Sequence, residues 1–270
     1  MPDRAVRREA LAFLAMAVLV AACGTGEGAP HGGDFQEPPR WAPRPADQWE
    51  IQLQGAVALR EDTEVYDVDL DETAAAAVQE MHDAGAKVVC YLNAGAVEDW
   101  RSDSADFPAE VIGEPMDGWP GERWLDVRRI DVLEPIMRAR IEACRAKGFD
   151  AIDPDNVEGY ANPSGFDLTV ADAVAYFDVL ARIAHEQGMS IGLKNGAAMV
   201  TDVVDLADFA VNEQCQAFGE CDGWKPFAER GKAVLNIEYE GGADAACAGR
   251  PDGFTTVYGV PELDRPVTRC

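Results

Sequence analysis

Short apolar segments alternate with longer helix-like segments along the chain from residue 49 onwards. The short segments are rich in β-branched and aromatic residues and predict strands, whereas the longer ones have helical periodicity and predict helices. Several predicted helices end at a glycine, such as Gly85, Gly148 or Gly188, which suits a left-handed C-terminal cap. Alternating strands and helices form a parallel sheet, and eight such units predict a single (β/α)8 TIM barrel of the α/β class. The predicted strands are residues 50–54, 64–70, 87–93, 149–153, 190–195, 209–214, 233–239 and 255–260, and the clearest predicted helices are 72–84, 132–146, 170–187 and 201–206.

A long segment, residues 94–129, separates the third predicted strand from the next predicted helix. It contains one strand-like run, RWLDVR at residues 123–128, but no convincing helix. A parallel strand needs a crossover before the following parallel strand, and the first helix that could supply it begins near Val132. We therefore predict one long loop after the third strand, and loops of this length in a compact domain are usually functional.

Polar residues gather on one face of most predicted strands, near the carboxyl end. Because side chains alternate along a strand, we predict that the apolar faces contact the helices and that the polar faces point into the barrel. Active sites of TIM barrels lie at the carboxyl ends of the strands, so the inward polar residues are site candidates. They include Gln52 and Gln54 opposite Ile51 and Leu53, Asp67 and Asp69, Tyr91 and Asn93, Lys194, and Asn236 and Glu238 opposite Leu235 and Ile237.

The fourth predicted strand ends in two carboxylates, Asp153 and Asp155, which share a face because they are two residues apart. Glu213 ends the sixth strand, and Lys194 on the fifth strand is expected to lie between them. Paired carboxylates at a barrel mouth, without a Ser–His pair or a metal-ligand cluster, fit glycoside hydrolysis. Each residue alone could equally form an ion pair at the end of the barrel, but their coincidence over several strands favours a site. Aromatic residues that could stack on sugar rings are Tyr91, Trp100, Trp119, Trp124 and Tyr160.

We expect no metal and no cofactor. The run DVDLDE at residues 67–72 imitates the start of a calcium loop, but Glu72 replaces the turn glycine and Val78 stands where a bidentate glutamate is needed. The three histidines are scattered and there is no C-x-x-C pair, which argues against structural zinc.

The N-terminus reads as an export signal. Three arginines precede the apolar run Ala10–Ala22, which is too short to span a bilayer. The run ends in VAAC, which resembles a bacterial lipoprotein signal with lipidation at Cys23; the alternative is an ordinary secretory signal. We therefore divide the chain into a signal peptide (1–22), a lipidated cysteine with a Gly/Pro-rich linker (23–48) and the barrel domain (49–270), and we expect an exported protein anchored by lipid at the cell membrane or surface.

Six cysteines remain after Cys23, an even number that suggests three disulfides in an exported chain, although free buried thiols are the alternative. Cys215 and Cys221 are close enough to close a short loop, and Cys247 and Cys270 would hold the C-terminal tail. Cys90 is left with Cys144, on the helix that follows its strand.

The net charge of −26 argues against nucleic acid as a partner and suits a cationic substrate. A generally acidic or salt-adapted proteome would explain the charge equally well. We expect a monomer whose contact with the membrane is the lipid anchor alone.

Several segments together resemble glycoside hydrolase family 114, the endo-α-1,4-polygalactosaminidase family. They are WEIQLQG, VYDVDLDET, KVVCYLNAGAVEDWR, GWPGERWLDVR, GFDAIDPDNVEGY, GLKN, NEQC and IEY, in order between residues 49 and 239. The resemblance implies a TIM-barrel hydrolase of α-1,4-linked galactosamine polymers, with its two catalytic carboxylates at Asp155 and Glu213. Related α-glycosidase barrels imply a nucleophile on strand 4 and a general acid/base on strand 6, hence Asp155 and Glu213 respectively, with retention of configuration.

Asp153 is the rival nucleophile, although its deeper position suits support of Lys194. The candidates for substrate binding are Asp67, Asp69, Tyr91, Asn93, Trp124, Asp126, Asp153, Asn156, Lys194 and Glu238. Two other functions stay open at this point: a lipoprotein that binds polysaccharide without cleaving it, and a hydrolase for another α-linked sugar polymer.

Overall fold

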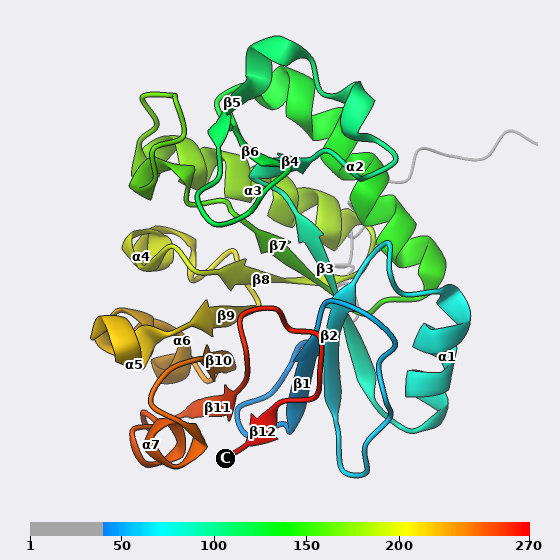
Figure 1. The fold of residues 1–270 in the computed structure, drawn as a ribbon, viewed down its shortest axis with the longest axis vertical. Coiled ribbons are helices and arrows are strands. Elements are labelled where there is room, and N and C mark those ends of the chain that lie inside the picture. Colours follow the sequence, from blue (N-terminus) through cyan, green and yellow to red (C-terminus); the bar gives the residue numbers. More distant parts are fainter. Residues whose placement is uncertain (1–39) are drawn as a thin grey trace, which may run out of the picture. The chain divides into compact units, whose positions relative to one another are not determined.

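A computed structural model describes residues 40–270. Eight strands lie side by side in parallel and in chain order, and a short ninth strand pairs antiparallel with the last of them. All eight predicted strands are confirmed, and with them the TIM-barrel-like architecture (Figure 1). The parallel strands are β1 (Trp49–Gln52), β2 (Val65–Asp69), β3 (Lys87–Asn93), β7 (Ala151–Asp155), β8 (Ser190–Lys194), β9 (Phe209–Glu213), β10 (Val234–Glu238) and β11 (Phe254–Tyr258), and the ninth is β12 (Thr268–Arg269).

The barrel is nearly closed, and the C-terminal segment joins its two edges. Leu53, just after β1, donates its backbone N–H to the carbonyl of Leu263 over 2.9 Å. The guanidinium of Arg269 on β12 lies 2.9 Å from the carboxylate of Glu50 on β1. These contacts cover edges that would otherwise present unpaired backbone groups.

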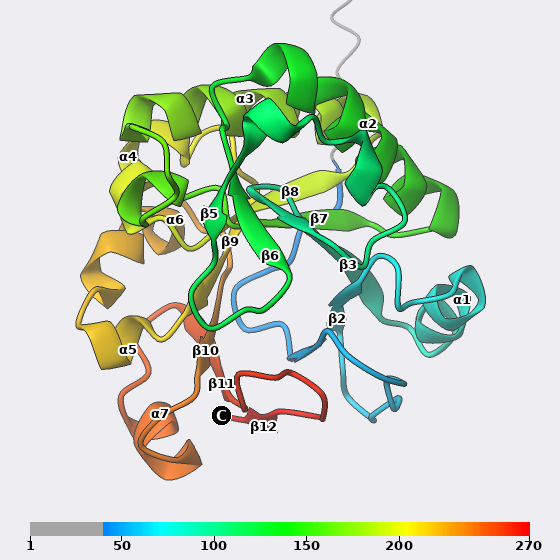
Figure 2. The same cartoon turned by 45° about the horizontal axis from the view of Figure 1, so that its top comes forward.

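Helices cover most of the outside of the strands in Figure 2, but a loop and no helix joins β1 to β2. The three long ones are close to prediction, and α3 begins with a capping box between Thr169 and Asp172. The first helix begins three residues later than predicted because Asp69 accepts the backbone N–H groups of Asp71 and Glu72 and holds a turn there. The helices are α1 (Ala75–Asp83), α2 (Ile130–Lys147), α3 (Val170–Glu186), α4 (Val200–Val203), α5 (Cys215–Phe218), α6 (Lys225–Glu229) and α7 (Ala243–Ala248). None of the helices within residues 40–270 has the length and apolar character needed to cross a bilayer.

The segment between β3 and α2 is more ordered than the predicted loop. It forms an antiparallel sheet in the order β4 (Ala96–Glu98), β6 (Glu122–Leu125), β5 (Ile112–Pro115), with 3₁₀ turns at Ser104–Asp106 and Ala109–Val111. The strand-like run at 123–128 supplies the central strand of this sheet, which we call the accessory sheet. The prediction of a long insertion after the third strand was right, and only its internal structure was missed.

Two apolar clusters hold the barrel together. One lies between the strands and the helices, and the other lies inside the barrel and includes Ile51, Val89, Phe209, Leu235 and Ile237. The face prediction was therefore wrong for β1 and β10, whose apolar residues point inward. Both faces of a central barrel strand are buried, so hydrophobic alternation alone does not tell which face is the interior.

Three disulfides form with the predicted pairing: Cys90–Cys144, Cys215–Cys221 and Cys247–Cys270. They join β3 to α2, α5 to the turn after it, and α7 to the end of the chain. Stable disulfides are typical of exported proteins.

We predict that the disulfides that close the longest and the shortest loops contribute unequally to stability. The Cys90–Cys144 bridge spans 54 residues and Cys215–Cys221 spans 6, so loop-closure entropy gives about 4 and about 2 kcal/mol respectively. Urea denaturation of the two double-alanine variants measures this difference. Equal losses would show that native-state interactions, rather than chain entropy, set the contribution of these bridges.

Candidate active site

A cleft of about 1250 Å³ opens at the carboxyl ends of the barrel strands. Residues at or just after the ends of β2, β3, β7, β8, β9 and β10 form its floor, and the accessory sheet forms one wall. The predicted site therefore lies at the predicted end of the barrel. The floor residues are Asp69, Tyr91, Asp155, Lys194, Glu213 and Tyr239.

Asp155 is the last residue of β7 and faces the cleft. Its carboxylate accepts a hydrogen bond of 2.7 Å from the Tyr91 hydroxyl and one of 3.0 Å from the backbone N–H of Asn156. Burial raises its pKa above the usual range, against the opposing charge of Lys194. The two donors fix the orientation of the carboxylate.

Glu213 ends β9 and also lines the cleft. Its carboxylate accepts hydrogen bonds from the Tyr239 hydroxyl and, over 2.9 Å, from the side-chain amide of Asn195. Burial alone would raise the pKa of Glu213, but Lys194 and these two donors outweigh it and hold the pKa below the usual range.

Lys194 lies between these carboxylates, as predicted. Its ammonium is 3.2 Å from Asp153 and 4.0 Å from Glu213, and the side chain is 1% exposed. Burial alone would lower the pKa of Lys194, but Asp153, Glu213 and Asp155 raise it well above its usual value. The lysine is therefore a fixed positive charge beneath the cleft.

The backbone has an unusual conformation directly after β7, β8 and β9. Asn156, Asn195 and Gln214 directly follow Asp155, Lys194 and Glu213, and all three have positive φ, at 65°, 49° and 62°. Left-handed backbone costs free energy in residues other than glycine and gathers at functional sites. Here it turns the chain sharply as each site residue reaches the mouth.

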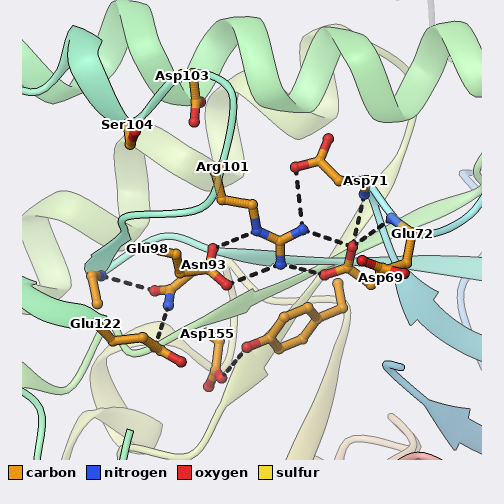
Figure 3. Close-up of polar contacts among 12 residues, drawn as sticks. Asp69, Asp71, Glu72, Asn93, Glu98, Arg101, Asp103, Ser104, Glu122 and Asp155 are labelled. Atoms are coloured by element: carbon orange, nitrogen blue, oxygen red, sulfur yellow. Dashed lines mark hydrogen bonds and ion pairs between the residues drawn. The ribbon is translucent and has the colours of Figure 1, made fainter. Parts of the chain in front are cut away.

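Arg101 forms the centre of an ion-pair cluster in the wall of the cleft (Figure 3). Its guanidinium donates to both carboxylate oxygens of Glu98, at 2.9 Å each, and to both oxygens of Asp69. It also reaches Asp71 at 3.2 Å. Asp69, a predicted substrate contact, lines the cleft, but its carboxylate is already engaged by Arg101 and by the turn before α1.

Two further glutamates lie at the edge of the cleft. Glu122 on β6 accepts a hydrogen bond of 3.0 Å from Asn93, and burial together with Glu98 and Asp155 raises its pKa to about 7. Glu158 follows β7, and burial together with Asp155 raises its pKa to about 8. One oxygen of Glu158 is buried without a hydrogen-bond partner in the described part of the chain.

We predict that Glu158→Gln stabilises the protein increasingly as the pH rises. A carboxyl whose pKa is raised on folding holds its proton more tightly in the native state than in the unfolded state. Wild-type Glu158 therefore lowers the free energy of unfolding progressively as the pH rises from its ordinary pKa of 4.5 to about 8. The stabilisation of Glu158→Gln over wild type should be larger at pH 9 than at pH 5 by at least about 1 kcal/mol, or roughly 2–4 °C in melting temperature. Exposed Glu220 is the matched control. A Glu158→Gln gain that is the same at both pH values would contradict the prediction.

Exposed aromatic side chains surround the cleft. Trp100, Trp119 and Phe218 are 56%, 46% and 70% exposed, and they are three of the four large apolar residues exposed within residues 40–270. All three line the cleft, as do Tyr91 and Tyr160. Exposed apolar surface concentrated at a cleft indicates ligand contact, and flat rings suit sugars.

Three predicted site residues lie elsewhere. Trp124 is 4% exposed and packs against Gly159, and Asp126 pairs with Arg128 at 2.7 Å. Glu238 lies on the opposite face of β10 from Ile237 and accepts the backbone N–H of Gln216 at the start of α5. Because the faces of β10 were predicted the wrong way round, Glu238 was chosen as a site residue in place of its neighbour Tyr239.

The remaining predicted residues fall in two groups. Asn156 lines the cleft, whereas Asp67, Asn93 and Asp153 are buried beneath it. Sequence reasoning missed several residues that line the cleft, namely Glu98, Arg101, Glu122, Glu158, Asn195 and Tyr239. Asn195 and Tyr239 are the last residues of the predicted strands 190–195 and 233–239, but Lys194 and Glu238 were chosen there instead. The accessory sheet gave no signal for its acidic residues.

No group of three or more His, Cys, Asp or Glu residues within residues 40–270 is arranged to hold a metal ion. The chemistry available in the described chain is that of two hydrogen-bonded carboxylates beside a buried lysine, under a rim of aromatic rings. Such a mouth on a TIM-like barrel is typical of a glycosidase.

Comparison with known proteins makes the assignment specific. The sequence profile of glycoside hydrolase family GH114 matches residues 33–270, and the chain belongs to this family. The crystal structure of Ega3 from Aspergillus fumigatus, in complex with galactosamine, is similar at a TM-score of 0.82 and 37% identity, covering 88% of this chain and 100% of that one. The glycoside hydrolase domain of PelA from Pseudomonas aeruginosa shares the fold at a TM-score of 0.68 and 12% identity, covering 82% of this chain and 98% of that domain. A search of curated proteins finds no significant match.

Proposed function

We propose that this glycosidase cleaves α-1,4-linked polysaccharide that contains galactosamine, with Asp155 as nucleophile and Glu213 as general acid/base. The observation that carries the proposal is the pair of oriented carboxylates at the ends of β7 and β9, each held by two hydrogen bonds at the floor of one cleft. Galactosamine in the complex of Ega3, a protein 37% identical to this one, supports the choice of sugar.

The proposed reaction has two steps and retains the configuration of the sugar. A carboxylate oxygen of Asp155 attacks the anomeric carbon as the glycosidic bond breaks, and the leaving oxygen takes a proton from Glu213. Water then attacks the glycosyl ester, Glu213 takes its proton, and Asp155 leaves as a carboxylate. Tyr91 and Tyr239 orient the two carboxylates throughout.

We assign the two roles from the positions of Asp155 and Glu213 on their strands. The pKa values of the free enzyme favour the opposite assignment. Before substrate binds, the pKa of Glu213 is lowered and that of Asp155 is raised. The proposed first step needs Glu213 protonated and Asp155 ionised, so binding of substrate has to reverse the order. Asp153, the rival nucleophile, is fully buried and engaged by Lys194.

The charge of the cleft favours a cationic sugar. Nine carboxyl side chains line it, from Asp69, Glu72, Glu98, Glu122, Asp155, Glu158, Glu213, Glu220 and Glu262, against the two cations Arg101 and Lys194. A protonated amine on galactosamine would be attracted into this cleft. We infer that the free amine, rather than its acetylated form, is the preferred 2-substituent.

Matched polymers test the substrate. We expect the enzyme to release oligosaccharides from partly deacetylated α-1,4-galactosaminogalactan and to release far fewer from the same polymer after complete N-acetylation. Raising the salt concentration should lower the rate on the deacetylated polymer, because the attraction is screened. Equal cleavage of both polymers would contradict recognition of the amine, and cleavage of neither would overturn the proposed substrate.

We also propose export and lipid anchoring at Cys23. The signal peptide, the lipidation site and most of the linker lie outside the described residues, whereas the three disulfides fit an exported domain. Incorporation of labelled fatty acid into the wild-type protein, and its loss in Cys23→Ala, is the expected result. Unlabelled wild-type protein recovered in the medium would support an ordinary secretory signal.

A further inference from the structure

Two carboxyl groups lie together inside the barrel, beneath the cleft. Asp67 on β2 and Asp153 on β7 are each 0% exposed, and their carboxyls are within hydrogen-bonding reach of one another. Within the described chain, neither oxygen of Asp67 and only one of Asp153 receives an N–H or O–H donor. The donor to Asp153 is the ammonium of Lys194, at 3.2 Å.

Ionising both groups would be costly. Like charges at this separation repel strongly in a buried site, and each unpaired carboxylate loses the hydration it has in water. Asp155 and Glu213, by contrast, each have two hydrogen-bond donors in addition to the nearby Lys194. Besides burial, the groups that act most strongly on the pKa of Asp67 are Asp153, Lys194 and Asp155, and of these only Lys194 is a cation.

A single proton resolves the conflict, because a protonated carboxyl donates a hydrogen bond to its ionised neighbour. We propose that Asp67 and Asp153 share one proton at neutral pH, that it resides on Asp67, and that Asp67 is a positioning residue for the lysine beneath the proposed catalytic carboxylates. Lys194 determines which carboxyl holds the proton, because its ammonium stabilises negative charge on Asp153 and makes no hydrogen bond to Asp67.

Burial and the neighbouring Asp153 raise the pKa of Asp67 well above its usual range, in agreement with this assignment. Burial raises the pKa of Asp153 less, to about 6, because Lys194 opposes the rise.

The shared proton has a consequence for the cleft. With the proton present, Asp67, Asp153 and Lys194 together are electrically neutral, and Asp153 holds the ammonium 4.0 Å from Glu213. An ionised Asp67 would add a negative charge that raises the pKa of Asp155. This part of the inference rests on the proposed function, whereas the shared proton does not.

Infrared spectroscopy tests the shared proton without substrate. At pH 7 the wild type should show a carboxylic acid C=O band that Asp67→Asn lacks. Glu122→Gln and Glu158→Gln serve as controls for the two other acids of the cleft whose pKa values are raised to about 7 and about 8. Wild-type and Asp67→Asn spectra that match in this region would overturn the proposal, whether or not the enzyme cleaves galactosamine polymers.

Activity tests the positioning role. Asp67→Asn keeps a donor towards Asp153 and should stay within a few-fold of the wild-type kcat/KM with an unshifted pH profile. Asp67→Leu has similar shape but no donor, and it should lose about 100-fold in kcat/KM because Lys194 is no longer held in place. If folded Asp67→Asn loses as much activity as Asp67→Leu, the positioning role is wrong; if Asp67→Leu does not fold, Asp67→Asn still decides through its pH profile.

Discussion

Lys194→Met should lower kcat/KM by at least about 1000-fold and shift the acidic limb of the pH profile to higher pH. The lysine is the cation that lowers the pKa of both Asp155 and Glu213, so its removal raises both values. It also leaves the buried carboxylate of Asp153 without its cation, and breaking a buried ion pair in this way costs about 3–5 kcal/mol of stability. The pH profile of folded protein, measured at low temperature, separates the electrostatic effect from the loss of stability.

Lys232→Met is the control for that experiment. Lys232 is a half-buried lysine that donates to the backbone carbonyls of Val204 and Ala207, outside the cleft. It should reduce stability and leave the pH profile in place. A Lys194→Met profile that coincides with the wild-type profile would contradict the electrostatic role given to the buried lysine.

Azide should rescue the two catalytic variants with opposite stereochemistry. On an aryl α-glycoside with a good leaving group, Glu213→Ala still forms the glycosyl ester, and azide then attacks it to give the α-azide. Asp155→Ala forms no ester, so azide attacks the anomeric carbon directly and gives the β-azide. Each single variant should lose at least about 1000-fold without azide on the natural polymer, because general acid–base catalysis alone supplies 100- to 10,000-fold.

The anomer that each variant forms shows which assignment of the two roles is right: the one from strand positions or the one that the pKa values of the free enzyme favour. An α-azide from Asp155→Ala together with a β-azide from Glu213→Ala would exchange the two roles. Proton NMR of the products measures the configuration directly. Tyr91→Phe offers a milder companion variant, because it removes one donor to Asp155 and keeps the ring.

The sequence predicted the barrel well because its signals were repeated. Every barrel strand had an apolar run, and glycines such as Gly148, with φ of 99°, ended helices where a left-handed residue is needed. The Cys90–Cys144 pair was predicted by elimination, and the outward face of Cys90 on β3, towards Cys144 on α2, agrees with it. The accessory sheet was missed because short antiparallel strands in a polar segment carry little periodicity.

The two carboxylates were predicted from their places at the strand ends, because hydrophobic phase was ambiguous on β9, where Phe209 and Val211 share the face of Glu213. Asp155 and Glu213 end strands whose inward residues below them, Ala151 and Phe209, belong to the interior cluster. On β10 both faces are buried, and hydrophobic alternation favoured Glu238 over Tyr239. Arg101 and Glu122 come from the insertion, so only the tertiary structure brings them to the barrel mouth.

The measurement that tests the central claim most directly is oligosaccharide release from partly deacetylated α-1,4-galactosaminogalactan by wild type, Asp155→Asn, Glu213→Gln and Asp126→Asn. Asp126 is the control, a carboxylate just after β6 in the insertion that follows β3, and it pairs with Arg128 away from the cleft. We predict release by the wild type and by Asp126→Asn, and a loss of several orders of magnitude in the other two. Folded Asp155→Asn or Glu213→Gln that cleaves at the wild-type rate would contradict the two-carboxylate site.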